Sequence, residues 1–110
     1  MVDAEISGTL TRSGLTEKEF ESIRTVFRQN PDIKRVVLFG SRAKGTAQPA
    51  SDIDLAIEGI KNEIEVARIA MELDELPLPY RFDVKSLDEI SHLPLREHIM
   101  RVGVTIYRKI

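Results

Sequence analysis

The first element predicted by the pattern of hydrophobic and polar residues is a helix beginning near residue 16. Thr16 and Glu19 have the spacing of a capping box, and Leu15 and Phe20 flank this start as a hydrophobic staple would. Pro31 follows at a distance that is expected to end the helix. Apolar residues recur between these two points on one helical face: Phe20, Ile23 and Phe27.

After this helix, strands and helices alternate with short connections. The strand expected at 33–39 ends in four consecutive apolar residues, as a strand buried on both faces would. The helix expected at 61–76 carries apolar residues at helical spacing, among them Ile64, Ala67 and Met71. The remaining predicted elements are strands at 52–58, 80–85 and 103–110, a helical turn at 86–91 capped by Ser86, and a helix at 94–102. This order predicts an α/β (α+β) fold, a single small domain with a mixed sheet of about four strands and helices packed on it.

Length and composition restrict the classes of function. The 110 residues, 42% of them hydrophobic, are enough for one sheet and a few helices but not for a second core. The formal charge of -2 provides no overall basic field, so nucleic acid is unexpected except as an acceptor. The absence of cysteine excludes disulfides, zinc–thiolate sites and thiol catalysis.

The N-terminal part of the sequence suggests where the domain begins. Residues 1–14 mix acidic residues with Ser, Thr and Gly, have no apolar run, and are expected to form a flexible segment before a domain at 15–110. No apolar run in the rest of the chain reaches the length of a membrane span. A soluble cytoplasmic protein without a membrane partner is therefore expected.

Two carboxylates are predicted to leave one face of the second strand. Asp52 and Asp54 are separated by one residue, so their side chains project on the same side, about 6.6 Å apart along the backbone. Magnesium prefers oxygen ligands and uses only one or two protein carboxylates, with water and phosphate completing its shell. Ile53 and Leu55 would point the other way and anchor the strand in the core. The alternative is an edge strand with a charged solvent face.

The turn after the first strand is a candidate phosphate site. Gly40 and Ser41 follow a buried strand directly, and their backbone amides and the serine hydroxyl suit phosphate oxygens. An ordinary turn is the alternative. Gly40 and Gly45 also have the spacing of a Walker A motif, but Thr46 stands where the lysine of that motif should be. A P-loop enzyme is therefore not expected.

A third acid is predicted to project from another strand. Phe82 and Val84 alternate with Asp83, which places the carboxylate on the strand face opposite to theirs. If this strand neighbours the second one, Asp83 joins the other two acids and completes a cage for two metal ions. Otherwise it is a solvent-facing acid.

These motifs together resemble the polymerase-beta-like nucleotidyltransferases, in particular their minimal MNT-type members. The resemblance is carried by a glycine and serine followed by ten residues and then Asp-x-Asp, in the stretch VVLFGSRAKGTAQPASDIDLAIEG. Arg42, Lys44 and Gly45 look like family residues too, and RFDVKSLDEI resembles the segment with the third acid. The similarity covers residues 16–110 and implies the polymerase-beta-like nucleotidyltransferase fold.

The resemblance implies a role for each matching residue. Gly40 and Ser41 would hold the β- and γ-phosphates of a nucleoside triphosphate. The two-metal site, occupied by magnesium or manganese, would be formed by Asp52, Asp54 and Asp83, with Asp83 also helping to deprotonate the acceptor. Arg42 and Lys44 are candidates for triphosphate contacts, or else members of surface ion pairs.

The resemblance also implies a reaction and a partner. The expected reaction attaches NMP, expected to be AMP from ATP, to a hydroxyl and releases pyrophosphate. Minimal members are commonly paired with a small all-helical HEPN-like protein, in some systems a toxin that the transferase modifies, so such a partner, or failing that a homodimer, is expected. The alternative is a non-catalytic, antitoxin-like or nucleotide-binding subunit that acts by contact with its helical partner.

Three other polar or aromatic residues are less informative. His92 and His98 lie on either side of Pro94 without further ligands, which favours solvated or helix-end roles. Tyr80 has the features of a core tyrosine at a strand start, although stacking on a base is the alternative.

Overall fold

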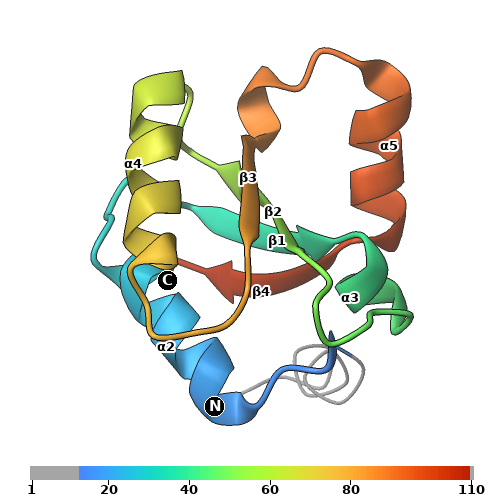
Figure 1. Ribbon diagram of the computed structural model, residues 1–110. Coiled ribbons are helices and arrows are strands. Elements are labelled where there is room, and N and C mark those ends of the chain that lie inside the picture. Colours follow the sequence, from blue (N-terminus) through green and yellow to red (C-terminus); the bar gives the residue numbers. More distant parts are fainter. Residues whose placement is uncertain (1–12, 110) are drawn as a thin grey trace.

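A four-stranded mixed sheet forms the centre of the protein, shown in Figure 1 as a computed structural model that describes residues 13–109. The strands lie in the order β3-β2-β1-β4, with β1 antiparallel to both neighbours and β2 parallel to β3. The elements are α2 (Glu17–Arg28), β1 (Arg35–Phe39), α3 (Ser41–Lys44), β2 (Ile53–Glu58), α4 (Glu63–Asp74), β3 (Phe82–Ser86), the 3-10 helix η1 (Leu87–Glu89), α5 (Leu93–Val102) and β4 (Val104–Arg108). The predicted fold class and element order are confirmed.

The expected start of the first helix is present in detail. The Thr16 hydroxyl accepts a hydrogen bond from the Glu19 amide at 3.1 Å, and the Glu19 carboxylate accepts one from the Thr16 amide at 2.9 Å. This reciprocal capping box satisfies two amides that an uncapped helix leaves without partners. Phe20, Ile23 and Phe27 are fully buried, as their spacing predicts.

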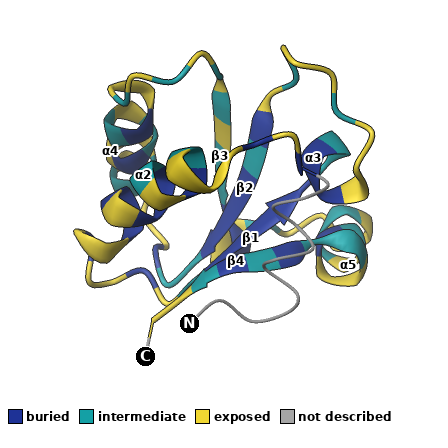
Figure 2. Ribbon diagram, turned by 90° about the horizontal axis from the view of Figure 1, so that it is seen from below, coloured by how far each residue is buried: buried dark blue, intermediate teal, exposed yellow. Residues whose placement is uncertain are grey.

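Helices cover both faces of the sheet, as Figure 2 shows. The face towards α2 and α4 has the larger apolar cluster, which includes Val36 and Leu38 of β1. The other face packs Val37 and Phe39 of the same strand against Ile99 of α5. β1 is therefore buried on both faces, as its continuous apolar run predicts.

The second long helix buries a different face from the expected one. Ile64 and Met71 are 76% and 64% exposed, and Ala67 is exposed as well. The helix instead buries Ile69 and Leu73. Both sets have helical spacing, so periodicity does not choose between them, and the residues that face the sheet are decided by how α4 docks on it.

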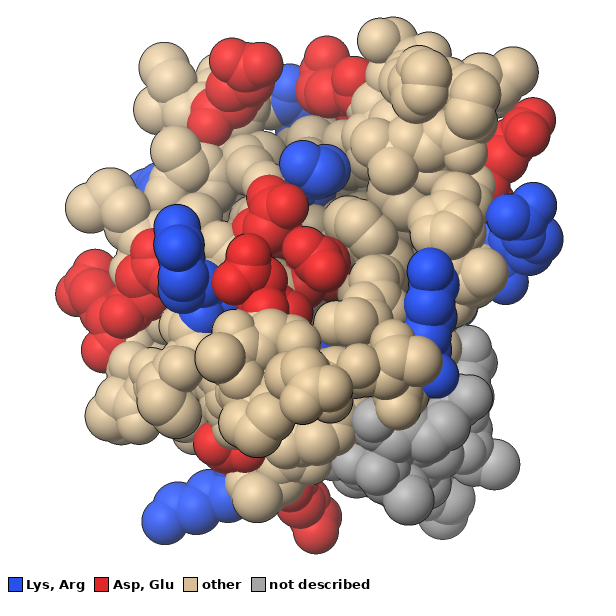
Figure 3. Space-filling view, turned by 45° about the vertical axis from the view of Figure 1, so that its right-hand side comes forward, with Lys and Arg blue, Asp and Glu red and all other residues tan. Residues whose placement is uncertain are grey.

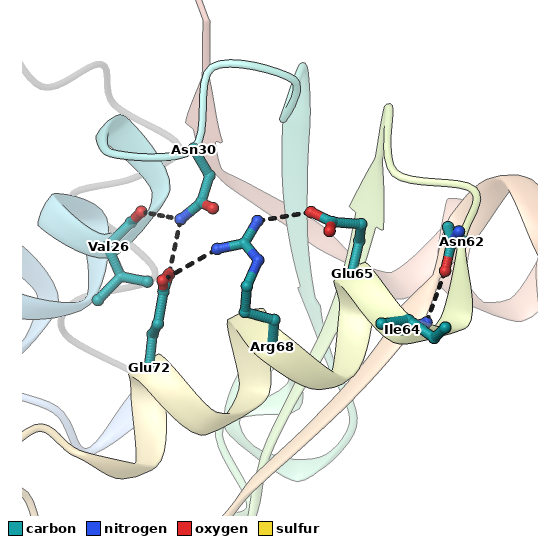
Figure 4. A network of polar contacts seen from close by, with 7 residues as sticks. All are labelled: Val26, Asn30, Asn62, Ile64, Glu65, Arg68 and Glu72. Atoms are coloured by element: carbon teal, nitrogen blue, oxygen red, sulfur yellow. Dashed lines mark hydrogen bonds and ion pairs between the residues drawn. The ribbon is translucent and has the colours of Figure 1, made fainter.

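Polar contacts join the end of α2 to α4, as seen from close by in Figure 4. The Asn30 side chain donates to the Val26 carbonyl at 2.7 Å and to the Glu72 carboxylate at 3.0 Å. Arg68 donates to Glu72 at 3.1 Å, and the Asn62 side chain accepts from the Ile64 amide at the start of α4. These contacts lie on the α2 and α4 side of the sheet.

Three further expectations concern the ends of elements. Ser86 is the N-cap residue of η1, but its side chain makes no capping hydrogen bond, and its hydroxyl donates to the Ile60 carbonyl. Ser13 is buried and its carbonyl accepts from Arg42, so the described end of the N-terminal segment packs on the domain. Residues 1–12, expected to be flexible, and Ile110 lie outside the described residues.

No helix within residues 13–109 has the length and apolar character that crossing a bilayer requires.

Candidate active site

Two neighbouring strands bring the three predicted acids to one face of the sheet. Asp54 of β2 is the register partner of Asp83 of β3, and paired residues point to the same side. Asp52 immediately precedes β2 and lies two residues before Asp54, so it projects on that side too. Figure 3 shows acidic side chains gathered near the middle of one face of the molecule, with basic side chains next to them.

The electrostatics of Asp54 reflect this crowding. Partial burial raises the pKa of the Asp54 carboxyl, and the negative charges of Asp83 and then Asp52 raise it further. The Lys85 ammonium lowers the pKa of Asp54 and lies 3.5 Å from the Asp83 carboxylate. The three acids thus repel one another, and bound cations would relieve that repulsion.

The strand that carries Asp54 is anchored from its opposite face. Ile53 and Leu55 are both 0% exposed and belong to the cluster under α2 and α4. Because these neighbours are fixed in the core, the Asp54 carboxylate has little freedom to move along or away from the sheet. The anchoring role predicted for them is confirmed.

Gly40 is placed where a side chain would be strained and would disturb Asp54. Phe39 pairs with Asp54, so the turn after β1 lies beside the acids. Gly40 has φ 74° and ψ -156°, a region that is open essentially to glycine alone. A Cβ atom at this position would collide with the Asp54 carboxylate. Ser41, the first residue of α3, follows this close approach and is partly exposed.

Arg42 is not placed for the expected phosphate contact. Its side chain is 1% exposed, and its guanidinium donates to the backbone carbonyls of Ser13, Pro49 and Ser51. The guanidinium carbon lies 4.7 Å from the centre of the Tyr80 ring. Tyr80 packs with the cluster on the other face of the sheet, so Arg42 lies on the side of the loop away from the acids. These interactions commit its donors to backbone groups.

Lys44 remains a candidate for a phosphate contact. It is exposed at the end of α3, the short helix that begins beside the acids, and it forms no ion pair with any residue between 13 and 109. The alternative expectation of a surface ion pair is thus not met within that part of the chain.

The donor set fits a divalent cation shared with a substrate. Within residues 13–109, no three acidic or histidine side chains are arranged to enclose an ion by themselves. Magnesium and manganese sites in nucleotide enzymes usually take one or two carboxylates and complete the shell with phosphate oxygens. Asp52, Asp54 and Asp83 supply hard oxygen ligands of this kind, and a cation beside them would offset the negative charges of Asp83 and Asp52 that, after burial, raise the pKa of Asp54.

One residue of the site was not identified from the sequence. Lys85 lies two residues after Asp83, so it projects from the same face of β3 and forms the ion pair described above. The signal was present in the alternation of Phe82 and Val84 with charged residues. Lysine beside a metal-binding acid is not part of the expected chemistry, so the sequence did not identify Lys85 as a residue of the site.

The residues that were discounted lie outside the acid cluster. Tyr80 donates its hydroxyl to Glu19 at 3.0 Å and packs against the core, as expected of a strand-start tyrosine. His92 is exposed immediately before α5 and makes no side-chain cap, and His98 is a partly exposed residue of that helix. The expected helix-end position of His92 is confirmed.

Comparison with known proteins finds relatives over most of the chain. The family model described as "Polymerase beta, Nucleotidyltransferase" matches residues 21–109. A Haemophilus influenzae protein named "Probable protein adenylyltransferase MntA" is 33% identical over 97 residues, which cover 86% of this chain and 84% of that protein.

Solved structures with the same fold include toxin–antitoxin complexes. One, described as a toxin-antitoxin with AMP-PNP, contains a chain that is 26% identical with a TM-score of 0.70, covering 82% of this chain and 73% of that one. Another, of a tri-AMPylated Shewanella oneidensis HEPN toxin with an MNT antitoxin, matches at 22% identity and a TM-score of 0.65, covering 84% and 72%. At that identity the second structure supports the fold alone. Since the family model matches residues 21–109, which are most of the chain, the protein belongs to the polymerase beta nucleotidyltransferase family.

Proposed function

We propose that this nucleotidyltransferase uses magnesium or manganese to transfer AMP from ATP to a hydroxyl group of a small helical HEPN-like partner protein. The observation that carries the proposal is the convergence of Asp52, Asp54 and Asp83 beside the turn at Gly40. Three mutually repelling carboxylates next to a glycine that brings the backbone close to Asp54 are suited to hold cations and a triphosphate.

Each acid has a part that follows from its position. Asp52 and Asp54, on one strand, hold the triphosphate through the cations that accompany it. Asp83, on the neighbouring strand, binds a cation beside Asp54 and orients the acceptor hydroxyl. Two divalent ions supply charge neutralisation for the attacking and leaving oxygens when bound. Asp83 is also the residue best placed to accept the hydroxyl proton.

The reaction is an in-line displacement at the α-phosphorus. The acceptor oxygen forms a bond to this phosphorus, the bond from the phosphorus to the bridging oxygen of the β-phosphate breaks, and pyrophosphate leaves. Gly40, Ser41 and Lys44 bind the β- and γ-phosphates, which keeps the leaving group in line with the acceptor. The protein thus contributes mainly positioning and charge neutralisation.

The base and the acceptor are inferred from relatives. The Haemophilus influenzae relative is named as a protein adenylyltransferase, and a related toxin–antitoxin structure contains AMP-PNP. These names support ATP as the donor and a toxin protein as the acceptor. The repulsion among the acids favours an enzyme over the alternative, a subunit acting by contact alone, because contact requires no such charge cluster.

A transfer assay tests the proposal. A small HEPN-like helical protein is incubated with this chain, magnesium and ATP labelled at the α-phosphate. Label is expected on the partner, and chelation of the metal or replacement of both Asp52 and Asp54 by Asn should abolish it. Asp74→Asn, which alters an exposed acid at the end of α4, is the matched control and should transfer normally. Equal labelling by the double variant would refute the proposed site.

A further inference from the structure

Arg42 connects three separate segments of the chain. Its Nη1 atom donates to the Ser13 carbonyl at 2.8 Å, and its Nη2 atom donates to the Pro49 and Ser51 carbonyls at 3.3 and 2.8 Å. Its Nε atom donates to Ser51 as well, at 3.2 Å. The planar guanidinium fork suits this arrangement, since it presents several donors in fixed directions at once.

The same side chain reaches the segment that leads into β3. The guanidinium carbon lies 4.7 Å from the centre of the Tyr80 ring, a cation–π contact made by a group almost wholly removed from solvent. Tyr80 is held in turn by its hydroxyl, which donates to Glu19 of the capping box at the start of α2. Arg42 therefore packs on a ring whose own position is fixed by α2.

The loop before Asp52 has few other means of support. Residues 48–50 are exposed and contribute little to any core. The other hydrogen bonds of residues 47–51 that involve described residues are internal ones, between Gln48 and Ser51. Within the described chain, hydrogen bonds from this loop to the rest of the protein thus all go to Arg42.

We infer that Arg42 is a positioning residue for the acid cluster and does not touch the substrate. It holds Ser51, the residue before Asp52, and Tyr80, three residues before Asp83, so one side chain aligns the backbone that delivers two acids from different strands. The inference rests on the proposed function for the meaning of the cluster, but the contacts themselves do not depend on it. Groups that orient metal ligands without binding the metal typically contribute about 10- to 100-fold to metal affinity or activity.

Three arginine variants test this role. Arg42→Met removes the fork, Arg42→Lys keeps a charge without the fork, and Arg96→Met is the matched control, because Arg96 also donates to a carbonyl, that of Leu87, but away from the acids. Manganese affinity is measured by electron paramagnetic resonance with a non-hydrolysable ATP analogue present, and hydrogen exchange is followed in the peptide that spans the loop. Arg42→Met should weaken manganese binding about 10- to 100-fold and speed exchange in the loop.

The transfer kinetics should separate positioning from phosphate binding. In Arg42→Met, kcat should fall at ordinary metal concentration and recover in part as manganese is raised, while KM for ATP at saturating metal changes little. Arg42→Lys should lie between this variant and the wild type. Arg96→Met should lower thermal stability without changing manganese affinity or loop exchange.

The opposite pattern would overturn the inference. If Arg42 bound the triphosphate, its variants would raise KM for ATP at every metal concentration and leave manganese affinity and loop exchange at wild-type values. Should Arg42→Met not fold, Arg42→Lys decides between these patterns. Should the wild type show no transfer, the proposed function fails, while manganese affinity and loop exchange still decide the role of Arg42.

Discussion

The two faces of the sheet differ in what they bury. The face under α2 and α4 is closed by large apolar side chains, including Phe20, Phe27 and Leu55, all fully buried. The face under α5 has a small apolar cluster, and beyond it the acids lie open to solvent, with Asp52 and Asp83 exposed. Strand alternation places stability on one face and charge on the other, so substitutions on the two faces should have separable effects.

The largest expected effect is a loss of transfer rate caused by a substitution on the charged face. Asp83→Asn keeps the shape of the side chain but removes a charge and a proton acceptor, and losing a positioned base or its metal costs roughly 10²–10⁴ in rate. Metal-dependent ATP affinity should fall much less, because Asp52 and Asp54 remain. Asp52→Asn should damage both quantities. Transfer kinetics and calorimetry with ATP and magnesium measure the difference, and wild-type transfer by Asp83→Asn would show that this acid is only a solvent-facing strand residue.

The second effect is on the apolar face and on stability alone. Phe27 is 0% exposed in the cluster under α2, and truncating a buried phenylalanine to alanine typically costs about 3–5 kcal/mol. Denaturant unfolding of Phe27→Ala should show this loss, while the folded fraction binds ATP and magnesium normally. Ile64→Ala on the exposed face of α4 is the control and should change stability by less than about 0.5 kcal/mol. Loss of ATP affinity in the folded fraction of Phe27→Ala would mean that the two faces are coupled.

The third expected effect, at Gly40, combines a loss of stability with a loss of ATP binding. Gly40→Ala must adopt a backbone conformation that costs of order 1–3 kcal/mol, and its Cβ would displace the Asp54 carboxylate. Stability should therefore fall modestly while metal-dependent ATP binding is lost. Gly45→Ala is the control, since Gly45 also has a positive φ of 79° but ends α3 on the far side from Gly40. Equal loss of ATP binding in both variants would attribute the effect to the shape of α3 instead of to Asp54.

Sequence patterns predicted the elements and the acids but not every role. The alternation of Ile53, Asp54 and Leu55 is enough to predict which side chains are buried, because a strand has only two faces. Helix α4 has two apolar sets at the same spacing, so the exposed position of Met71 depended on docking. The structural role of Arg42 could not be predicted, because its partners are backbone carbonyls from segments brought together only by folding.

The pairing of β3 with β2 was likewise beyond the sequence. Asp83 was expected near the other acids only if its strand neighboured β2, and nothing in the local pattern determines that neighbour or the register. The parallel pairing that places Asp83 beside Asp54 follows from the crossover through α4.

The smallest expected effect is the loss of folding stability that Asp54 causes when no metal is bound. Burial, together with the charges of Asp83 and Asp52, raises the pKa of Asp54 in the folded protein above its ordinary value. The folded state therefore binds more protons than the unfolded state between those two values, and the wild type loses stability as pH rises through that window. Asp54→Asn has no proton to lose, so without metal it should be more stable than the wild type at pH 7. This difference should shrink as pH falls below the ordinary pKa of an aspartate, where the wild-type carboxyl is protonated in both states.

Magnesium with ATP should reverse the order of stability of the two proteins at pH 7, because only the wild type gains binding free energy from the ions. Thermal unfolding across pH measures the effect, with Asp74→Asn as the control. If the difference in stability between Asp54→Asn and the wild type does not vary with pH, the pKa of Asp54 is not raised in the folded protein.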